Sequence, residues 1–166
     1  MVPTRFKALL ELLVSSKVNF VLIGGLAAVA RGSARVTVDL DVVYDRSIDN
    51  VRRLVSALAP IHPYLRGAPP NLPFKFDELT IARGLNFTLN TDWGDIDLLG
   101  EVTGGGTYPQ LIPHSTLVTL YETQFQCVDL DTLIHLKRSA GRTKDFEAIA
   151  ELETLRLQLR QNERKE

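Results

Sequence analysis

The sequence predicts a mixed α/β (α+β) fold, in which helices flank a short mixed β-sheet and a helical C-terminal segment follows. Over the first hundred residues, short apolar runs typical of buried strands alternate with segments whose apolar residues recur at helical spacing. Beyond residue 128, only helical patterns remain. Apolar residues make up 45% of the chain and charged residues 23%, which is enough apolar material for one folded core.

The first part of the chain predicts five elements in alternation. Leu9, Leu10 and Leu13 recur at helical spacing, and the apolar strand that follows ends at the pair Gly24-Gly25. The expected order is helix 5–17, strand 20–23, helix 26–31, strand 36–44 and helix 49–59.

The second part predicts a hairpin and then two helices. Prolines make 60–75 a loop, and the triple glycine 104–106 indicates a flexible break. The remaining elements are strands 85–89 and 95–99 of one hairpin, short strands 117–120 and 125–128, and helices 130–140 and 144–160. We expect 1–112 to form the core, with 113–166 as a small hairpin plus helical segment packed on it.

Charge and cysteine content exclude several classes of protein. With 19 basic and 20 acidic residues the net charge is −1, which disfavours a generally cationic nucleic-acid binder. The single Cys127 forms no intramolecular disulfide and is expected to be a buried, inert thiol, so a cytoplasmic location is expected. The uncharged stretch 18–30 has 13 residues, whereas a membrane span needs about 20.

The segment Ile23-Gly24-Gly25-Leu26 joins a predicted strand to a predicted helix. Glycine lets the backbone approach a phosphate group closely, and helix starts offer unpaired N–H groups. Such a turn alone is a weak signal, and a plain turn is the alternative. It matches neither the dinucleotide-binding pattern nor the Walker loop.

Asp39 and Asp41 lie two residues apart in a predicted strand, so both side chains project from the same face. Two like charges ~4 Å apart repel by about 4 kcal/mol at an effective dielectric of 20. A divalent cation is the usual compensation. The alternative is a solvated strand face, or pairing with Arg31 or Arg35.

Asp97 lies between Ile96 and Leu98 in a second predicted strand, and it completes a triad with Asp39 and Asp41 if the two strands are neighbours. Asp95 shares the face of Asp97 and is the competing candidate, although its place beside a glycine suggests the end of a turn. Three carboxylates beside a glycine turn are typical of metal-assisted phosphoryl or nucleotidyl transfer.

These segments resemble a known family. Gly24-Gly25, Asp39-x-Asp41 and the later Asp97 resemble the nucleotidyltransferase signature of the DNA polymerase β superfamily. The string 24–41 and the C-terminal stretch 133–146 are similar to its small AbiEii-type branch, whose members often serve as toxins of toxin–antitoxin pairs. The resemblance spans roughly 20–155.

The resemblance implies a nucleotidyltransferase fold and an enzyme that moves an NMP from an NTP to a hydroxyl of RNA or protein, releasing pyrophosphate. It also implies an antitoxin as a partner. The alternatives are a catalytically silent nucleotide- or partner-binding module of the same fold, and a small-molecule transferase of the antibiotic-modifying type.

The expected catalytic and metal-binding residues are Asp39, Asp41 and Asp97, with two Mg²⁺ ions as cofactor. The expected nucleotide-binding residues are Gly24, Gly25, Lys137 and Arg35. For Lys137 the alternative is a cation on a solvated helix face. Where many relatives have a histidine before the glycine at position 32, this chain has Arg31, so activity that depends on that histidine is in question.

Overall fold

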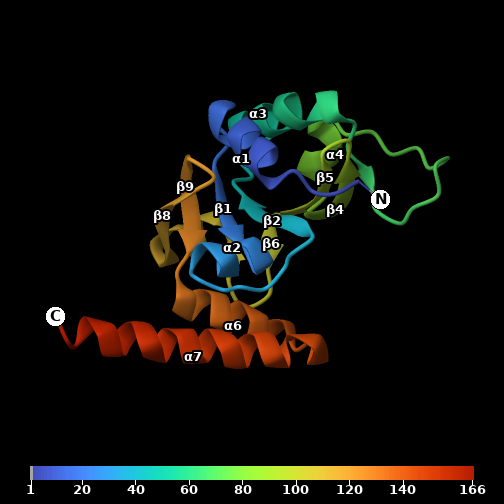
Figure 1. Ribbon diagram of the computed structural model, residues 1–166. Helices are drawn as coiled ribbons and strands as arrows, with labels where there is room; N and C mark the ends of the chain where they lie inside the picture. The colour runs from blue at the N-terminus through green and yellow to red at the C-terminus, as the bar shows by residue number, and fades with distance from the viewer. Residues whose placement is uncertain (1) are drawn as a thin grey trace.

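The computed structural model describes residues 2–166, which form one mixed sheet with helices around it (Figure 1). The sheet has seven strands in the order β3-β4-β5-β2-β1-β9-β8. β1 pairs with β9, and β2 with β5, in parallel, while the other neighbours are antiparallel. The strands are β1 (Phe20–Ile23), β2 (Asp39–Tyr44), β3 (Tyr64–Leu65), β4 (Asn86–Thr91), β5 (Gly94–Leu99), β8 (Ser115–Leu120) and β9 (Thr123–Val128).

Helices and a short ribbon complete the fold. α1 packs against α3, α2 against α6, and α6 against the long α7, which runs along the bottom of Figure 1. The helices are α1 (Phe6–Ser15), α2 (Gly24–Ala30), α3 (Ile48–Leu58), α4 (Glu78–Arg83), α5 (Tyr108–Leu111), α6 (Leu130–Ala140) and α7 (Phe146–Glu163). The ribbon pairs β6 (Glu101–Val102) with β7 (Gly106–Thr107), and single 3-10 turns are η1 (Ala59–Ile61), η2 (Ile112–His114) and η3 (Thr143–Asp145).

The core lies around the two central strands, β1 and β2. All four residues of β1 are buried, and the apolar residues of β2 face the core. Leu9, Leu10 and Leu13 of α1 are fully buried, as their helical spacing predicts. Burial of a leucine side chain stabilises the fold by about 1.5–3 kcal/mol, so this packing fixes the strands that hold the polar groups described below.

The mixed α/β fold, the hairpin β4–β5 and the long helices confirm the sequence predictions. The predicted strand 36–44 begins only at Asp39, because the chain ahead of it is exposed: Val36 and Val38 are 92% and 67% exposed. Alternation with Asp39 and Asp41 predicts that Val38 enters the core together with Leu40 and Val42; this is wrong for Val38, which lies outside the strand.

Two predicted irregular segments contain structure. Strand β3 interrupts the proline-rich stretch 60–75, where it pairs with β4. The triple glycine 104–106 is not a free break, since a Cβ at Gly104 would lie 2.3 Å from the Oγ of Ser139 and one at Gly105 would lie 2.7 Å from Leu136 Cδ2. These glycines let the ribbon pack directly on α6.

No helix within residues 2–166 combines the length and hydropathy that a membrane span requires. Cys127 is fully buried in β9, as expected, and burial raises the pKa of its thiol to about 11. A thiol with such a raised pKa is a poor nucleophile near neutral pH.

Candidate active site

Three carboxylates meet on one face of the sheet, at the parallel pair β2–β5. The register places Asp39 opposite Asp95 and Asp41 opposite Asp97, so the two predicted strands are neighbours. Carboxylate oxygens of Asp39, Asp41 and Asp97 all lie within 4.8 Å of one another. The sequence predicted this grouping on the condition that the two strands are neighbours, which their pairing confirms. Hard divalent cations prefer such oxygen ligands.

The electrostatics of this group favour a cation. Burial and then the charges of Asp39 and Asp97 together raise the pKa of Asp41 to about 8, while the charge of Lys137 lowers it. The pKa of Asp97 is raised as well, mainly by burial. Asp41 and Asp97 also share a hydrogen bond. In the absence of a metal, the pair therefore holds a proton near neutral pH.

Arg66, directly after β3, reaches into this carboxylate group. Its Nη2 donates to Oδ1 of Asp97 at 2.8 Å and to the carbonyl of Leu89 at 2.7 Å. Its Nε lies 3.3 Å from Oδ2 of Asp95, and its Nη1 lies 3.8 Å from Oδ2 of Asp39. One guanidinium thus offsets part of the charge of three carboxylates. Although Arg66 contacts both Asp95 and Asp97, only Asp97 belongs to the close triad, and Asp95 stays outside it.

The sequence analysis missed Arg66. Its position depends on the pairing of a strand of two residues with β4, more than twenty residues away in the chain. A strand so short leaves no periodic pattern. The only available signal was indirect: a carboxylate cluster needs cations, and Arg66 is a basic residue in the proline-rich segment.

The turn Gly24-Gly25 lies against the carboxylates. Gly24 has φ +72°, and a Cβ there would lie 2.1 Å from Oδ2 of Asp41. A Cβ at Gly25 would lie 2.5 Å from Oγ1 of Thr37. Both positions therefore require glycine, for lack of space and, at Gly24, for backbone conformation as well. This close approach places the turn directly beside Asp41.

Two predicted cations line the same cleft, with different surroundings. Lys137 of α6 makes no ion pair among residues 2–166, and its charge acts on Asp41. Arg35 lies in the chain ahead of β2, and its Nε donates to Oε2 of Glu151 at 2.7 Å, with Glu147 3.3 Å from its Nη2. The charge of Arg35 is thus largely balanced by α7, whereas that of Lys137 is available to a ligand.

Arg31 has a structural place at the end of α2. Its guanidinium donates to the carbonyls of Val128 and Cys127 at 2.9 and 2.8 Å, and to Oγ1 of Thr116 at 2.9 Å. It ties the end of α2 to β8 and β9 and makes no contact with the carboxylates, which removes one alternative of the sequence analysis.

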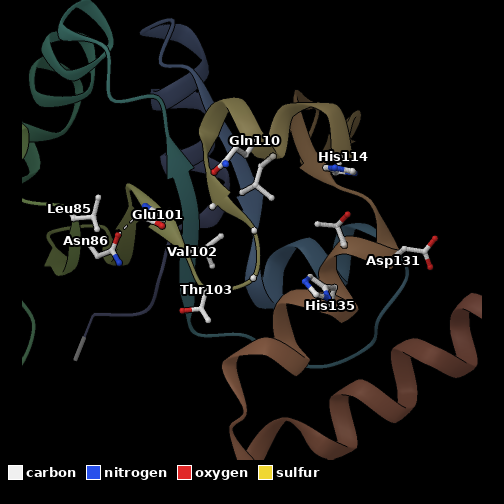
Figure 2. A pocket seen from close by; sticks show the side chains of 14 residues that line it. Leu85, Asn86, Glu101, Val102, Thr103, Gln110, His114, Asp131 and His135 are labelled. Carbon is white, nitrogen blue, oxygen red and sulfur yellow. Dashed lines mark hydrogen bonds between the residues drawn. The ribbon is translucent and has the colours of Figure 1, made fainter.

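These groups line a single cleft of ≈ 560 Å³, which includes the glycine turn, the three carboxylates and Lys137. A second cavity of ≈ 980 Å³ adjoins it, and Figure 2 shows this cavity between the β6–β7 ribbon and the start of α6. Residues that line both are Asn86, Glu101, Val102 and Thr103. The two cavities therefore share this part of their walls.

Comparison with known proteins shows the fold. No protein-family model matches the sequence, and no curated protein matches it. Among solved structures, the lincomycin-bound lincosamide antibiotic adenylyltransferase LnuA aligns over 93% of this chain and 99% of its own, with a TM-score of 0.61 and 16% identity. TM1012 of Thermotoga maritima, assigned as a nucleotidyltransferase, aligns over 96% of this chain and 97% of its own, with a TM-score of 0.50 and 15% identity. This chain therefore has the nucleotidyltransferase fold.

Proposed function

We propose that this protein transfers an NMP from an NTP to an acceptor hydroxyl and releases pyrophosphate. The observation that carries the proposal is the meeting of Asp39, Asp41 and Asp97 beside the turn Gly24-Gly25 in one cleft. The fold, shared with LnuA and TM1012, is consistent with this chemistry.

The residues fit a divalent metal. Three carboxylate oxygens within 4.8 Å of one another suit Mg²⁺. A bound cation would offset the burial and the mutual repulsion that raise the pKa of Asp41. Asp39, Asp41 and Asp97 would hold two Mg²⁺ ions. When bound, the metal supplies charge neutralisation at the triphosphate and at the reacting oxygens.

The chain's own residues supply binding and proton transfer. Backbone N–H groups of the Gly24-Gly25 turn bind the β- and γ-phosphates, because the missing side chains allow close approach. Lys137 neutralises phosphate charge. Arg35 lies at the cleft edge, where its guanidinium donates N–H groups to the nucleotide although Glu147 and Glu151 largely balance its charge. The acceptor oxygen attacks the α-phosphorus, its proton passes to Asp97, and the bond between the α-phosphorus and the bridging oxygen breaks to release pyrophosphate.

The acceptor defines the biological role. By the resemblance it is a hydroxyl of RNA or of a protein, in which case the protein acts in the cytoplasm as the toxin of a pair with an antitoxin. The second cavity beside the cleft favours a small molecule instead, as for the antibiotic-modifying LnuA. A catalytically silent module is disfavoured, because binding alone gives no reason to retain three mutually repelling carboxylates.

The test is a transfer assay with α-³²P- and γ-³²P-labelled NTPs, Mg²⁺ and, separately, total RNA, protein and small-molecule fractions of a cell extract. We expect α-label on the acceptor and γ-label in pyrophosphate. Asp39→Asn combined with Asp41→Asn abolishes both. Transfer that persists in this double variant contradicts the proposal. So does hydrolysis of the NTP that releases the α- and γ-labels into solution with no α-label on any acceptor.

A further inference from the structure

We propose that the second cavity is the acceptor site and that it takes a small molecule with several hydroxyl groups and an amine. This inference rests on the proposed function and names the substrate class of that reaction. The reacting hydroxyl forms the new bond to the α-phosphorus, its proton goes to Asp97, and pyrophosphate leaves.

The cavity adjoins the cleft that holds the carboxylates. Asn86 and Glu101 line both the cavity and the cleft. Asn86 is the register partner of Leu99, which lies two residues after Asp97 on the same face of β5. At ~3.3 Å per residue, the edge of the cavity is about 7 Å from Asp97 along the strand. A molecule seated in the cavity must extend about this far past Asn86 to place a hydroxyl at Asp97.

The shape is that of a preformed small-molecule site. Its volume of ≈ 980 Å³ lies within the range of roughly 300–1,000 Å³ typical of such sites. Figure 2 shows Val102 and Thr103 on the ribbon side, and Asp131 and His135 on α6 across from them. The ribbon packs on α6 through Gly104, where a Cβ would lie 3.3 Å from Nε2 of His135. The wall is thus already in place without a ligand.

The charges of the cavity exclude a polyphosphate backbone and favour a cation. Within residues 2–166, no lysine or arginine lines it. The carboxylate of Asp131 is engaged by Arg156 and Arg160 at 3.0 and 3.4 Å, whereas Glu101 makes no ion pair among the described residues. An RNA acceptor needs cations along its phosphates. One uncompensated carboxylate instead suits an amine.

Polar side chains complete the recognition of hydroxyl groups. The side-chain oxygen of Asn86 accepts from the backbone N–H groups of Gly100 and Glu101 at 2.9 and 3.3 Å, a contact drawn in Figure 2. Its NH₂ group is therefore left as a donor. The rings of His114 and His135 face the same space and can donate or accept. Such groups match hydroxyls, which donate and accept in turn.

The test uses ¹⁵N-labelled protein and four probes: chitotriose, which carries amines, its N-acetylated neutral form, trigalacturonate, which carries carboxylates, and a nine-nucleotide RNA. Each is titrated to about 10 mM, above the ~1 mM expected for a weak site, while backbone amide shifts are followed. The variants are Glu101→Gln and, as matched control, Glu122→Gln in the β8–β9 turn at the far end of β8.

We expect chitotriose to shift amides of 101–107 and 131–135 and to bind at least about fivefold more weakly to Glu101→Gln, since an ionic hydrogen bond is lost at a partly screened site. Glu122→Gln leaves its affinity unchanged, and the N-acetylated form binds more weakly than chitotriose. The inference is overturned if chitotriose leaves these amides unshifted, if Glu101→Gln has no effect, or if trigalacturonate or the RNA binds there more tightly.

The same samples separate this inference from the proposed function. Addition of Mg²⁺ and ATP is expected to shift the amides of Gly24 and Gly25 in the wild type. Asp39→Asn combined with Asp41→Asn loses these shifts and retains those of chitotriose. If Mg²⁺ and ATP leave Gly24 and Gly25 unshifted, the proposed function fails whatever the sugars do.

Discussion

Replacement of Asp41 by asparagine is expected to stabilise the metal-free protein while it removes activity. Burial, Asp39 and Asp97 raise the pKa of Asp41 from 3.8 to about 8. A carboxyl whose pKa is raised on folding contributes its full stability below pH ~4 and loses it as the pH rises toward 8. Over that range, the free energy of unfolding of the wild type falls by up to about 1.4 kcal/mol per pH unit for one proton.

The magnitude at pH 7 follows from the same shift. The interval from 3.8 to pH 7 corresponds to an upper limit of about 4 kcal/mol, and sharing of the proton with Asp97 reduces it. Asparagine has the same shape, has no charge and can donate an N–H to Asp97. We therefore expect a gain on the order of 2–4 kcal/mol, or about 5–15 °C in Tm for a chain of this length.

The assay is thermal unfolding followed by circular dichroism in EDTA at pH 5, 7 and 8. The wild-type Tm should fall from pH 5 to pH 8, and the Asp41→Asn profile should be flatter and higher at pH 7 and 8. Asp49→Asn, on the exposed start of α3, serves as a control with little change. A wild-type Tm that is constant across this range, together with an Asp41→Asn variant less stable than wild type at pH 7, would refute the reasoning.

Three further substitutions probe other parts of the cleft. Gly24→Ala should abolish transfer and lower the free energy of unfolding more than Gly67→Ala does. Gly67 has a similar φ of +77°, but no atom lies within 4 Å of a Cβ there. Denaturant titrations of both variants measure the difference. Lys137→Ala should raise the KM for NTP at least about tenfold, since a charge-assisted phosphate contact is lost. The neighbouring Arg138 pairs with Glu153, so Arg138→Ala should leave the KM for NTP unchanged. Arg66→Ala should lower the Mg²⁺ concentration that half-saturates the thermal shift, because the guanidinium competes for the same carboxylates, and an unchanged midpoint would contradict this.

The carboxylates and glycines were predictable because their signal is local. Asp39 and Asp41 alternate with buried residues in one strand, and Asp97 repeats that pattern in a second. The sequence does not show that the two strands are neighbours, and the parallel register of β2 and β5 confirms that they are. The roles of these residues stay predictions until activity is measured.

The remaining features depend on contacts that no local pattern encodes. Arg35 is paired with Glu151, 116 residues further along the chain, and Arg66 reaches Asp97 through a strand of two residues. Composition does not distinguish a flexible glycine from one packed against a helix, so the ribbon around Gly104 and the cavity beside it were not anticipated.

The most direct test of the account is a crystal structure with Mn²⁺ and α,β-methylene-ATP, which binds without being cleaved. We predict anomalous scattering peaks from Mn²⁺ ions that are coordinated by the carboxylate oxygens of Asp39, Asp41 and Asp97. The triphosphate should lie along the Gly24-Gly25 turn with Lys137 beside it. A nucleotide bound elsewhere, or no anomalous peak at the three carboxylates at saturating Mn²⁺, would contradict the assignment of this cleft as a nucleotidyltransferase active site.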